Sequence, residues 1–195
     1  MLKIGLTGGM GSGKSSVAYV LQMLGYPVYE SDREAARITD SLPEIRHELI
    51  RIFGPEIYTD HKLNRTLFAS LLFNDPQSLK QANSIIHPAV MNDFNHWCLQ
   101  QTAPLVFMES AIIFEAGLNG FFDVIITVCA DQEIRINRVL QRDKTTREEI
   151  LERISNQWTD EEKAGLSDYY ISNYEHDSVL PQLLEILAEI DHELK

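Results

Sequence analysis

Gly8-Gly9-Met10-Gly11-Ser12-Gly13-Lys14-Ser15 is the stretch that decides the fold of this chain. It fits the phosphate-binding loop pattern Gly-x-x-x-x-Gly-Lys-[Ser/Thr] without a gap. The glycines let the backbone turn its N–H groups inward, where they bind phosphate oxygens together with the N-terminus of the following helix. In such a loop Lys14 reaches the β- and γ-phosphates, and the Ser15 hydroxyl binds Mg²⁺. We therefore expect one continuous set of residues to bind a nucleoside triphosphate: Gly9, Met10, Gly11, Ser12, Gly13, Lys14, Ser15 and Ser16.

The segments on both sides of this loop agree with the pattern. Residues 1–7 form a short apolar run, which predicts a buried parallel strand. Residues 16–24 carry apolar side chains at the i, i+3, i+4, i+7 spacing of an amphipathic helix, at Val17, Val20, Leu21 and Leu24. A glycine-rich turn that binds nothing is the alternative. Strand, glycine loop and helix in this order favour the phosphate loop.

Composition limits the class of protein. The chain has 195 residues, of which 44% are hydrophobic and 24% charged, as in a single globular domain. Its net charge of -12 argues against a nucleic-acid partner or an anionic membrane surface. Cys98 and Cys129 have no metal-ligand spacing and suggest thiols of a reducing compartment. A strand is expected from residue 2, so we expect no signal peptide. No apolar run is long enough to span a membrane, and we therefore expect a cytoplasmic enzyme.

Strands and helices alternate along the chain, which predicts an α/β fold. Further short strands are expected at residues 26–30, 104–109, 123–128 and 169–173. With the first strand they form a five-stranded parallel sheet flanked by helices. Between residues 30 and 104 we expect consecutive helices, broken at Pro43, and no strand. Within this block, residues of about 55–90 are predicted to form a helical insertion suited to cover a substrate.

Two later segments are also predicted to be helical. Ile85-Ile86 precedes His87-Pro88, which we expect at a junction between two helices because proline is favoured in a first turn. His87 at such a junction has two interpretations, a buried or capping side chain and a cleft residue. A final helix is expected over residues 178–194.

Two acidic residues are candidates for the chemistry. Asp32 follows the second predicted strand, and ligands of open α/β sheets lie at the carboxyl ends of strands, so it can serve as a catalytic base. The alternative is an N-cap for a helix starting at Arg33. Glu109 ends the third predicted strand, where a carboxylate assists Mg²⁺. Its alternative is a helix cap or a surface position.

Arginines recur at helical spacing within a polar segment, at Arg138, Arg142 and Arg153. Residues 138–165 are predicted to form a helical lid whose arginines could stabilise charge on the transferred phosphoryl group. The alternative is a solvated helix face. A GTPase would carry an Asn-Lys-x-Asp motif, and a motor ATPase is usually longer. The residues alone therefore indicate a small kinase that acts on a metabolite.

Several motifs together resemble the dephospho-CoA kinase family over nearly the whole chain. Residues 7–15 are similar to its Thr-Gly-Gly-Ile-Gly-Ser-Gly-Lys-Ser loop, and residues 31–37 to its Ala-Asp-x-x-Ala-Arg segment. Four shorter elements follow in the family's order: Leu63-Asn64-Arg65, Ile85-Ile86-His87-Pro88, Gln141-Arg142-Asp143, and Arg153-Ile154 with Gln157. Departures occur at Glu109 and Ala111, where the family commonly has Asp and Pro, and at Ser172, where it usually has Asp.

The resemblance implies a P-loop kinase fold and transfer of the γ-phosphoryl group of ATP to the ribose 3′-hydroxyl of dephospho-CoA, with Mg²⁺ as cofactor. Lys14, Asp32 and Arg142 are the expected catalytic residues, and Arg142 also closes over ATP. The acceptor would contact Asp32, Arg65, His87 and Ile112, and the metal would be held by Ser15 and Glu109. We expect a monomer or weak homo-oligomer. Open alternatives are a nucleoside or shikimate kinase and a regulatory module that hydrolyses ATP slowly.

Overall fold

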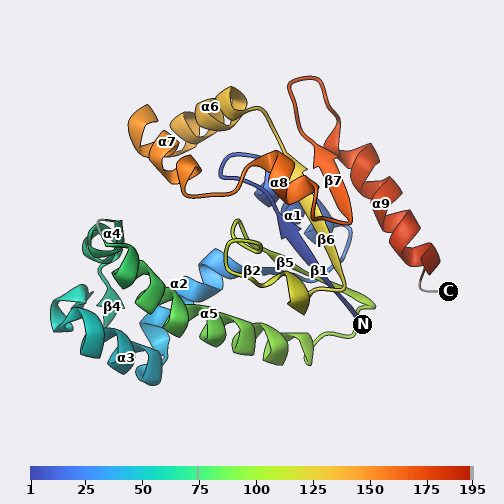
Figure 1. Cartoon of the computed structure of the whole chain (residues 1–195). Helices are drawn as coiled ribbons and strands as arrows, with labels where there is room; N and C mark the ends of the chain where they lie inside the picture. The colour runs from blue at the N-terminus through green and yellow to red at the C-terminus, as the bar shows by residue number, and fades with distance from the viewer. Residues whose placement is uncertain (74, 194–195) are drawn as a thin grey trace. The chain divides into compact units, whose positions relative to one another are not determined.

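The chain folds into two compact units in the computed structural model, which describes residues 1–73 and 75–193 (Figure 1). The first, here called the sheet unit, comprises Met1–Tyr29 and Thr102–Lys195. The second, the helical unit, comprises Glu30–Gln101. One continuous segment of the chain therefore forms the helical unit, and the sheet unit is built from the segments before and after it.

A five-stranded sheet has the strand order β2-β5-β1-β6-β7. Strand β1 pairs in parallel with β5 and β6, and β6 pairs in parallel with β7. The prediction of a five-stranded parallel sheet is confirmed. The strand bounds are Leu2–Thr7 for β1, Val28–Glu30 for β2, Leu105–Glu109 for β5, Val124–Cys129 for β6 and Tyr169–Ser172 for β7.

Helices α1 (Lys14–Met23) and α9 (Val179–Glu193) form the main core with one face of this sheet. Alternate residues of a strand point to the same face, so Ile4 and Leu6 of β1 reach this core, with Phe107 of β5 beside them. The predicted end of the last helix, Leu194, lies outside the described residues. The remaining helices of the sheet unit are η2 (Asn119–Phe121), α6 (Gln132–Arg142), α7 (Arg147–Ser155) and α8 (Asp160–Ala164).

The segment after β5 packs on the opposite face of the sheet. Gly5 lies between Ile4 and Leu6, and a Cβ atom at Gly5 would come within 2.9 Å of the Ile113 side chain. Ile113 and Phe114 form a small buried cluster with Ile125 of β6. A side chain at position 5 would therefore displace the segment that follows Glu109.

Lys163 of α8 holds the same segment through a buried ion pair. Its Nζ is fully buried, lies 2.8 Å from Glu115 Oε1 and donates to the Ala111 carbonyl at 2.7 Å. Glu115 Oε1 also accepts from the Trp158 backbone N–H at 3.0 Å, and the Trp158 indole stacks on Phe114 with ring centroids 5.9 Å apart. A buried ammonium needs such partners, since charge is costly to remove from water.

The helical unit contains a small hairpin that the sequence did not predict. Strands β3 (Tyr58–Thr59) and β4 (Lys62–Leu63) pair antiparallel, so the expectation of no strand between residues 30 and 104 is wrong. Asp60 and His61 between them both adopt positive φ, at 49° and 67°, as tight hairpin turns require. The helices of this unit are α2 (Ser31–Ser41), α3 (Pro43–Phe53), η1 (Pro55–Ile57), α4 (Arg65–Phe73) and α5 (Pro76–Cys98).

Helix α5 is continuous through Pro88, so the predicted helix junction at His87-Pro88 is wrong. A proline inside a helix removes one N–H donor and crowds the carbonyl four residues earlier. Packing compensates here, because α5 contacts α2, α3 and α4 within the helical unit. The predicted break at Pro43 is confirmed, since α2 ends at Ser41 and α3 begins with Pro43. Across the described part of the chain, no helix combines the length and hydrophobicity needed to cross a bilayer.

Truncation of Phe107 tests the importance of the sheet core. Its ring is fully buried and meets Tyr26 edge to face, with centroids 5.6 Å apart. We expect Phe107→Ala to lower the free energy of unfolding by about 3–5 kcal/mol, because it leaves a cavity between the sheet and α1. Denaturant unfolding measures this change. The control Leu99→Ala removes a side chain that is 84% exposed and should change stability by less than about 0.5 kcal/mol.

Candidate active site

The phosphate-loop residues connect the end of β1 to the start of α1, as predicted. Gly13 precedes the helix with φ of 104°, a conformation that favours glycine. A Cβ atom at this position would also lie 2.1 Å from Asn173 Nδ2, so a larger residue is excluded on both grounds. Ser15 and Ser16 follow in the first turn of α1, whose N-terminus carries partial positive charge.

Side chains from distant segments hold the loop by its carbonyl groups. The Ser12 carbonyl accepts from Asn173 Nδ2 at 2.7 Å and from Arg138 Nη1 at 3.3 Å. The Met10 carbonyl accepts from Arg135 Nε at 2.9 Å, and the Met10 N–H donates to Gln157 Oε1 at 2.9 Å. The backbone shape of the loop is therefore set from outside the motif.

Lys14 is buried, and its Nζ donates to the Gly9 carbonyl at 3.3 Å. The Ser12 N–H also donates to the Gly9 carbonyl, at 3.1 Å. The Lys14 side chain thus folds back over the loop.

Ser15 and Glu109 come together at the carboxyl end of the sheet. Glu109 is the last residue of β5 and is in register with Leu6 of β1, directly before the loop. The Ser15 hydroxyl donates to Glu109 Oε1 at 3.4 Å. A hydroxyl and a carboxylate are hard oxygen ligands, which suit Mg²⁺. Within residues 1–73 and 75–193, no group of three or more His, Cys, Asp or Glu side chains could hold a metal ion.

The three predicted arginines have different partners. Arg138 binds the Ser12 carbonyl and also contacts Asn173, so it supports the loop backbone. Arg142, in the last turn of α6, is exposed and donates through Nε and Nη2 to Asp143, at 2.8 Å in both cases. These hydrogen bonds raise the pKa of Arg142, with a smaller contribution from Glu109, so its guanidinium stays charged. Arg153 lies in α7.

Asp32 is the second residue of α2 and is exposed. The helix begins at Ser31, and its N-cap residue is Glu30. The interpretation of Asp32 as the N-cap of a helix starting at Arg33 is therefore wrong. Its place in the chain, directly after β2, is as predicted.

The predicted acceptor residues lie in both units. Arg65 begins α4 in the helical unit, where its Nη2 donates to the Ala36 carbonyl and pairs with Asp40 Oδ2, at 3.1 Å in both cases. His87 lies within α5, and burial lowers the pKa of its imidazole, which favours the neutral form. Ile112 belongs to the sheet unit, in the turn after β5, and its N–H donates to Ser110 Oγ at 3.4 Å.

Three residues around the loop were missed as loop contacts. Gln157 occurs in a motif of the family resemblance and Asn173 at the end of the predicted strand 169–173, but the sequence does not say what they contact. Arg135 precedes Arg138 by one helical turn, and this spacing is the one signal that could have indicated it. Its ion-pair partner Asp160 is 25 positions away in the chain, beyond any local pattern.

Comparisons with known proteins show the family of this chain. The sequence model of the dephospho-CoA kinase family matches residues 2–178. A dephospho-CoA kinase of Bacteroides fragilis is 40% identical over 188 residues, which are 96% of this chain and 92% of that protein. A crystal structure of the protein TT1252 from Thermus thermophilus is 36% identical with a TM-score of 0.85, covering 100% of this chain and 98% of the other.

A more distant structure defines the fold class. Shikimate kinase from Acinetobacter baumannii has a TM-score of 0.58 at 15% identity, over 100% of this chain and 96% of that chain, so the two share a fold. The predicted P-loop kinase fold is confirmed. Because the family model covers almost the whole chain and the relatives match over nearly their full length, the chain belongs to the dephospho-CoA kinase family.

Proposed function

We propose that this protein transfers the γ-phosphoryl group of ATP to the ribose 3′-hydroxyl of dephospho-CoA, giving CoA and ADP. The observation that carries the proposal is the phosphate loop next to Glu109, within a chain that matches the dephospho-CoA kinase family over residues 2–178. In this transfer the 3′-oxygen forms a bond to the γ-phosphorus. The bond from that phosphorus to the bridging oxygen of ADP breaks.

The backbone and side chains of the phosphate loop bind and orient the phosphates of ATP. Amide groups of the loop and the N-terminus of α1 bind the β- and γ-phosphates, and the Lys14 ammonium neutralises charge that moves toward ADP. Ser15 and Glu109 would hold Mg²⁺, since their oxygens already lie 3.4 Å apart. The metal, when bound, would supply positive charge that stabilises the phosphate oxygens. Arg142 closes over ATP from the end of α6.

Asp32 acts on the acceptor hydroxyl. Its carboxylate follows β2, which is a sheet neighbour of β5, the strand that ends in Glu109. It accepts the proton of the 3′-hydroxyl or orients this hydroxyl in line with the γ-phosphorus. Arg65, His87 and Ile112 bind the rest of dephospho-CoA. The pairing of Arg65 with Asp40 supports this role, because it restrains a long exposed side chain.

The chain works as one P-loop kinase domain with two helical additions. Residues 55–90 form the acceptor-binding insert, and residues 138–165 form the lid, which excludes water that would otherwise hydrolyse ATP. Cys98 and Cys129 are buried and are not in a disulfide, which is consistent with a cytoplasmic protein. We also propose that the protein is a monomer or weak homo-oligomer.

An acceptor assay tests the proposed function directly. ADP release from Mg²⁺-ATP is followed with dephospho-CoA, adenosine or shikimate as acceptor, each at the same concentration. We expect release to depend on dephospho-CoA. Dependence on adenosine or shikimate would indicate another metabolite kinase, and equal release without any acceptor would indicate an ATP-hydrolysing regulatory module.

Asp32→Asn tests the role of the carboxylate. Asparagine keeps the size of the side chain but cannot accept the proton at neutral pH, so we expect kcat to fall about 10²–10⁴-fold while ATP still binds. Steady-state kinetics with ATP binding by calorimetry measures both. Glu48→Gln, which removes an exposed acid of α3, is the matched control. Normal turnover of Asp32→Asn would remove Asp32 from the chemistry.

Lys14→Ala tests the loop assignment. It removes the ammonium that balances charge on the leaving ADP, so phosphoryl transfer should fall below detection. Circular dichroism checks that the variant remains folded. Transfer at the wild-type rate in the folded variant would contradict the proposed role of the phosphate loop.

Arg65→Ala tests acceptor binding. Removing a charged donor should raise KM for dephospho-CoA about 10-fold or more. KM for ATP should stay within about 2-fold of the wild-type value. Arg51→Ala, at an exposed arginine of α3, is the control. Equal increases in both KM values would argue against a specific acceptor contact.

A further inference from the structure

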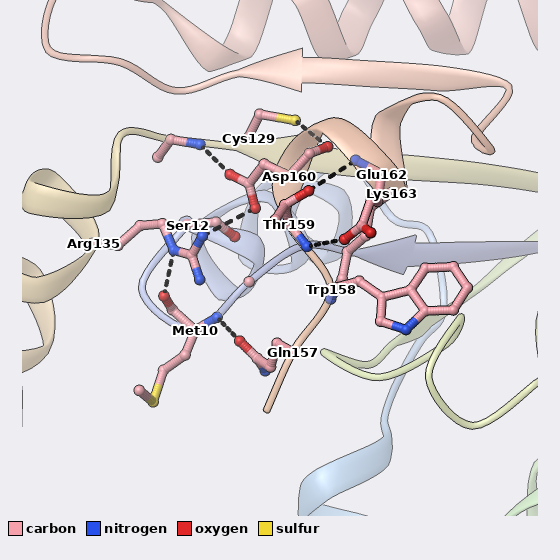
Figure 2. Close-up of polar contacts among 12 residues, drawn as sticks. Met10, Ser12, Cys129, Arg135, Gln157, Trp158, Thr159, Asp160, Glu162 and Lys163 are labelled. Atoms are coloured by element: carbon pink, nitrogen blue, oxygen red, sulfur yellow. Dashed lines mark hydrogen bonds and ion pairs between the residues drawn. The ribbon is translucent and has the colours of Figure 1, made fainter. Parts of the chain in front are cut away.

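Arg135 is a buried arginine beside the phosphate loop, at the start of α6 (Figure 2). The residue is only 5% exposed. Its Nε donates to the Met10 carbonyl at 2.9 Å, and its Nη1 lies 3.1 Å from Asp160 Oδ1. One planar guanidinium therefore connects the loop backbone to an acidic residue of α8.

Asp160 fixes the orientation of this guanidinium. It is 9% exposed, and its second oxygen, Oδ2, accepts from the Ala130 N–H at 2.9 Å. Ala130 directly follows β6, so the carboxylate is attached to the sheet as well as to Arg135. A buried charge is tolerated only with such partners, and removing one of them leaves the other unpaired.

The loop backbone rests directly on Arg135. A Cβ atom at Gly9 would lie 2.1 Å from Arg135 Nη2 and 2.4 Å from its Cζ. Among the described residues, Nη2 has no hydrogen-bond partner, although it is buried. Space for this nitrogen therefore depends on the absence of a side chain at Gly9. A smaller or displaced side chain at position 135 would leave Gly9 and Met10 without support.

Gln157 binds the other polar group of Met10. Its Oε1 accepts from the Met10 N–H at 2.9 Å (Figure 2). Gln157 lies in the connection between α7 and α8, and Asp160 is the first residue of α8. The Met10 side chain packs on the small cluster of α6 and α7 that contains Ile136 and Ile150. The Met10 N–H is thus bound by the segment proposed as the lid, and the Met10 carbonyl is bound by Arg135, which precedes that segment.

We propose that Arg135 is a positioning residue for the phosphate loop and that Asp160 holds Arg135 in place. The pair keeps Gly9 and Met10 in the conformation that presents the loop amides to the phosphates of ATP. Preorganised amides bind phosphate without the cost of ordering the loop at each binding event. This inference rests on the proposed function for the identity of the nucleotide.

Arg135→Met is the first test. Methionine keeps an unbranched stem but donates no hydrogen bond to the Met10 carbonyl. We expect KM for ATP and the Kd of a nonhydrolysable ATP analogue with Mg²⁺ to rise about 10–100-fold. KM for dephospho-CoA should change by less than about 2-fold. Calorimetric binding of the analogue needs no acceptor, so this result stands even if dephospho-CoA proves not to be the substrate.

The double variant R135M/D160N separates positioning from stability. The single variant leaves Asp160 buried without its cation and should unfold at a lower temperature. Asparagine at position 160 removes that charge, and its amide oxygen can still accept from Ala130. We expect the double variant to recover thermal stability over R135M while the affinity for the ATP analogue stays as weak as in R135M.

Two results would overturn the inference. One is wild-type affinity for the ATP analogue in the folded double variant, which would mean that Arg135 and Asp160 only stabilise the fold. The other is an equal loss of affinity in Arg51→Met, where the arginine pairs with Glu48 at 2.7 Å on the exposed surface of α3. Thermal melts of all variants define the temperature at which binding is compared.

Discussion

The amide groups of the phosphate loop must point toward the phosphate site. The carbonyl groups of the loop then need hydrogen-bond donors from other parts of the chain. Asn173 and Arg138 bind the Ser12 carbonyl, and Arg135 binds the Met10 carbonyl. These side chains come from α6 and from the end of β7, far from the loop in sequence. The amide geometry on which phosphate binding depends is thus a property of the whole sheet unit, not of the motif alone.

Much of the sheet unit could be predicted from the sequence because its signals are local. Short apolar runs identified the strands, and their parallel orientation followed from alternation with helices. Ser15 was predicted to bind Mg²⁺ from the loop motif, and Glu109 because a carboxylate at the end of such a strand assists Mg²⁺. Their oxygens do lie close together. The expected lid and insert contain helices, and their movement in the reaction stays a prediction.

What the sequence could not supply depends on contacts between distant residues. Packing within the helical unit keeps α5 continuous through Pro88, although proline locally favours a break. The turn of the β3–β4 hairpin has positive φ at Asp60 and His61. Because neither residue is a glycine, the sequence did not indicate a tight turn there. The pairing of Arg135 with Asp160 joins positions that have no common motif. Local patterns identified the nucleotide loop, and only the fold showed what supports it.

The stacking of Trp158 on Phe114 has a spectroscopic consequence. The chain contains two tryptophans, and Trp97 lies in α5 of the helical unit while Trp158 lies in the sheet unit. Each unit therefore carries its own intrinsic fluorophore. Trp158 is 40% exposed and lies next to Gln157, so its emission is sensitive to solvent in the connection between α7 and α8. With Trp97 replaced by phenylalanine, the tryptophan emission of this protein comes from that connection alone.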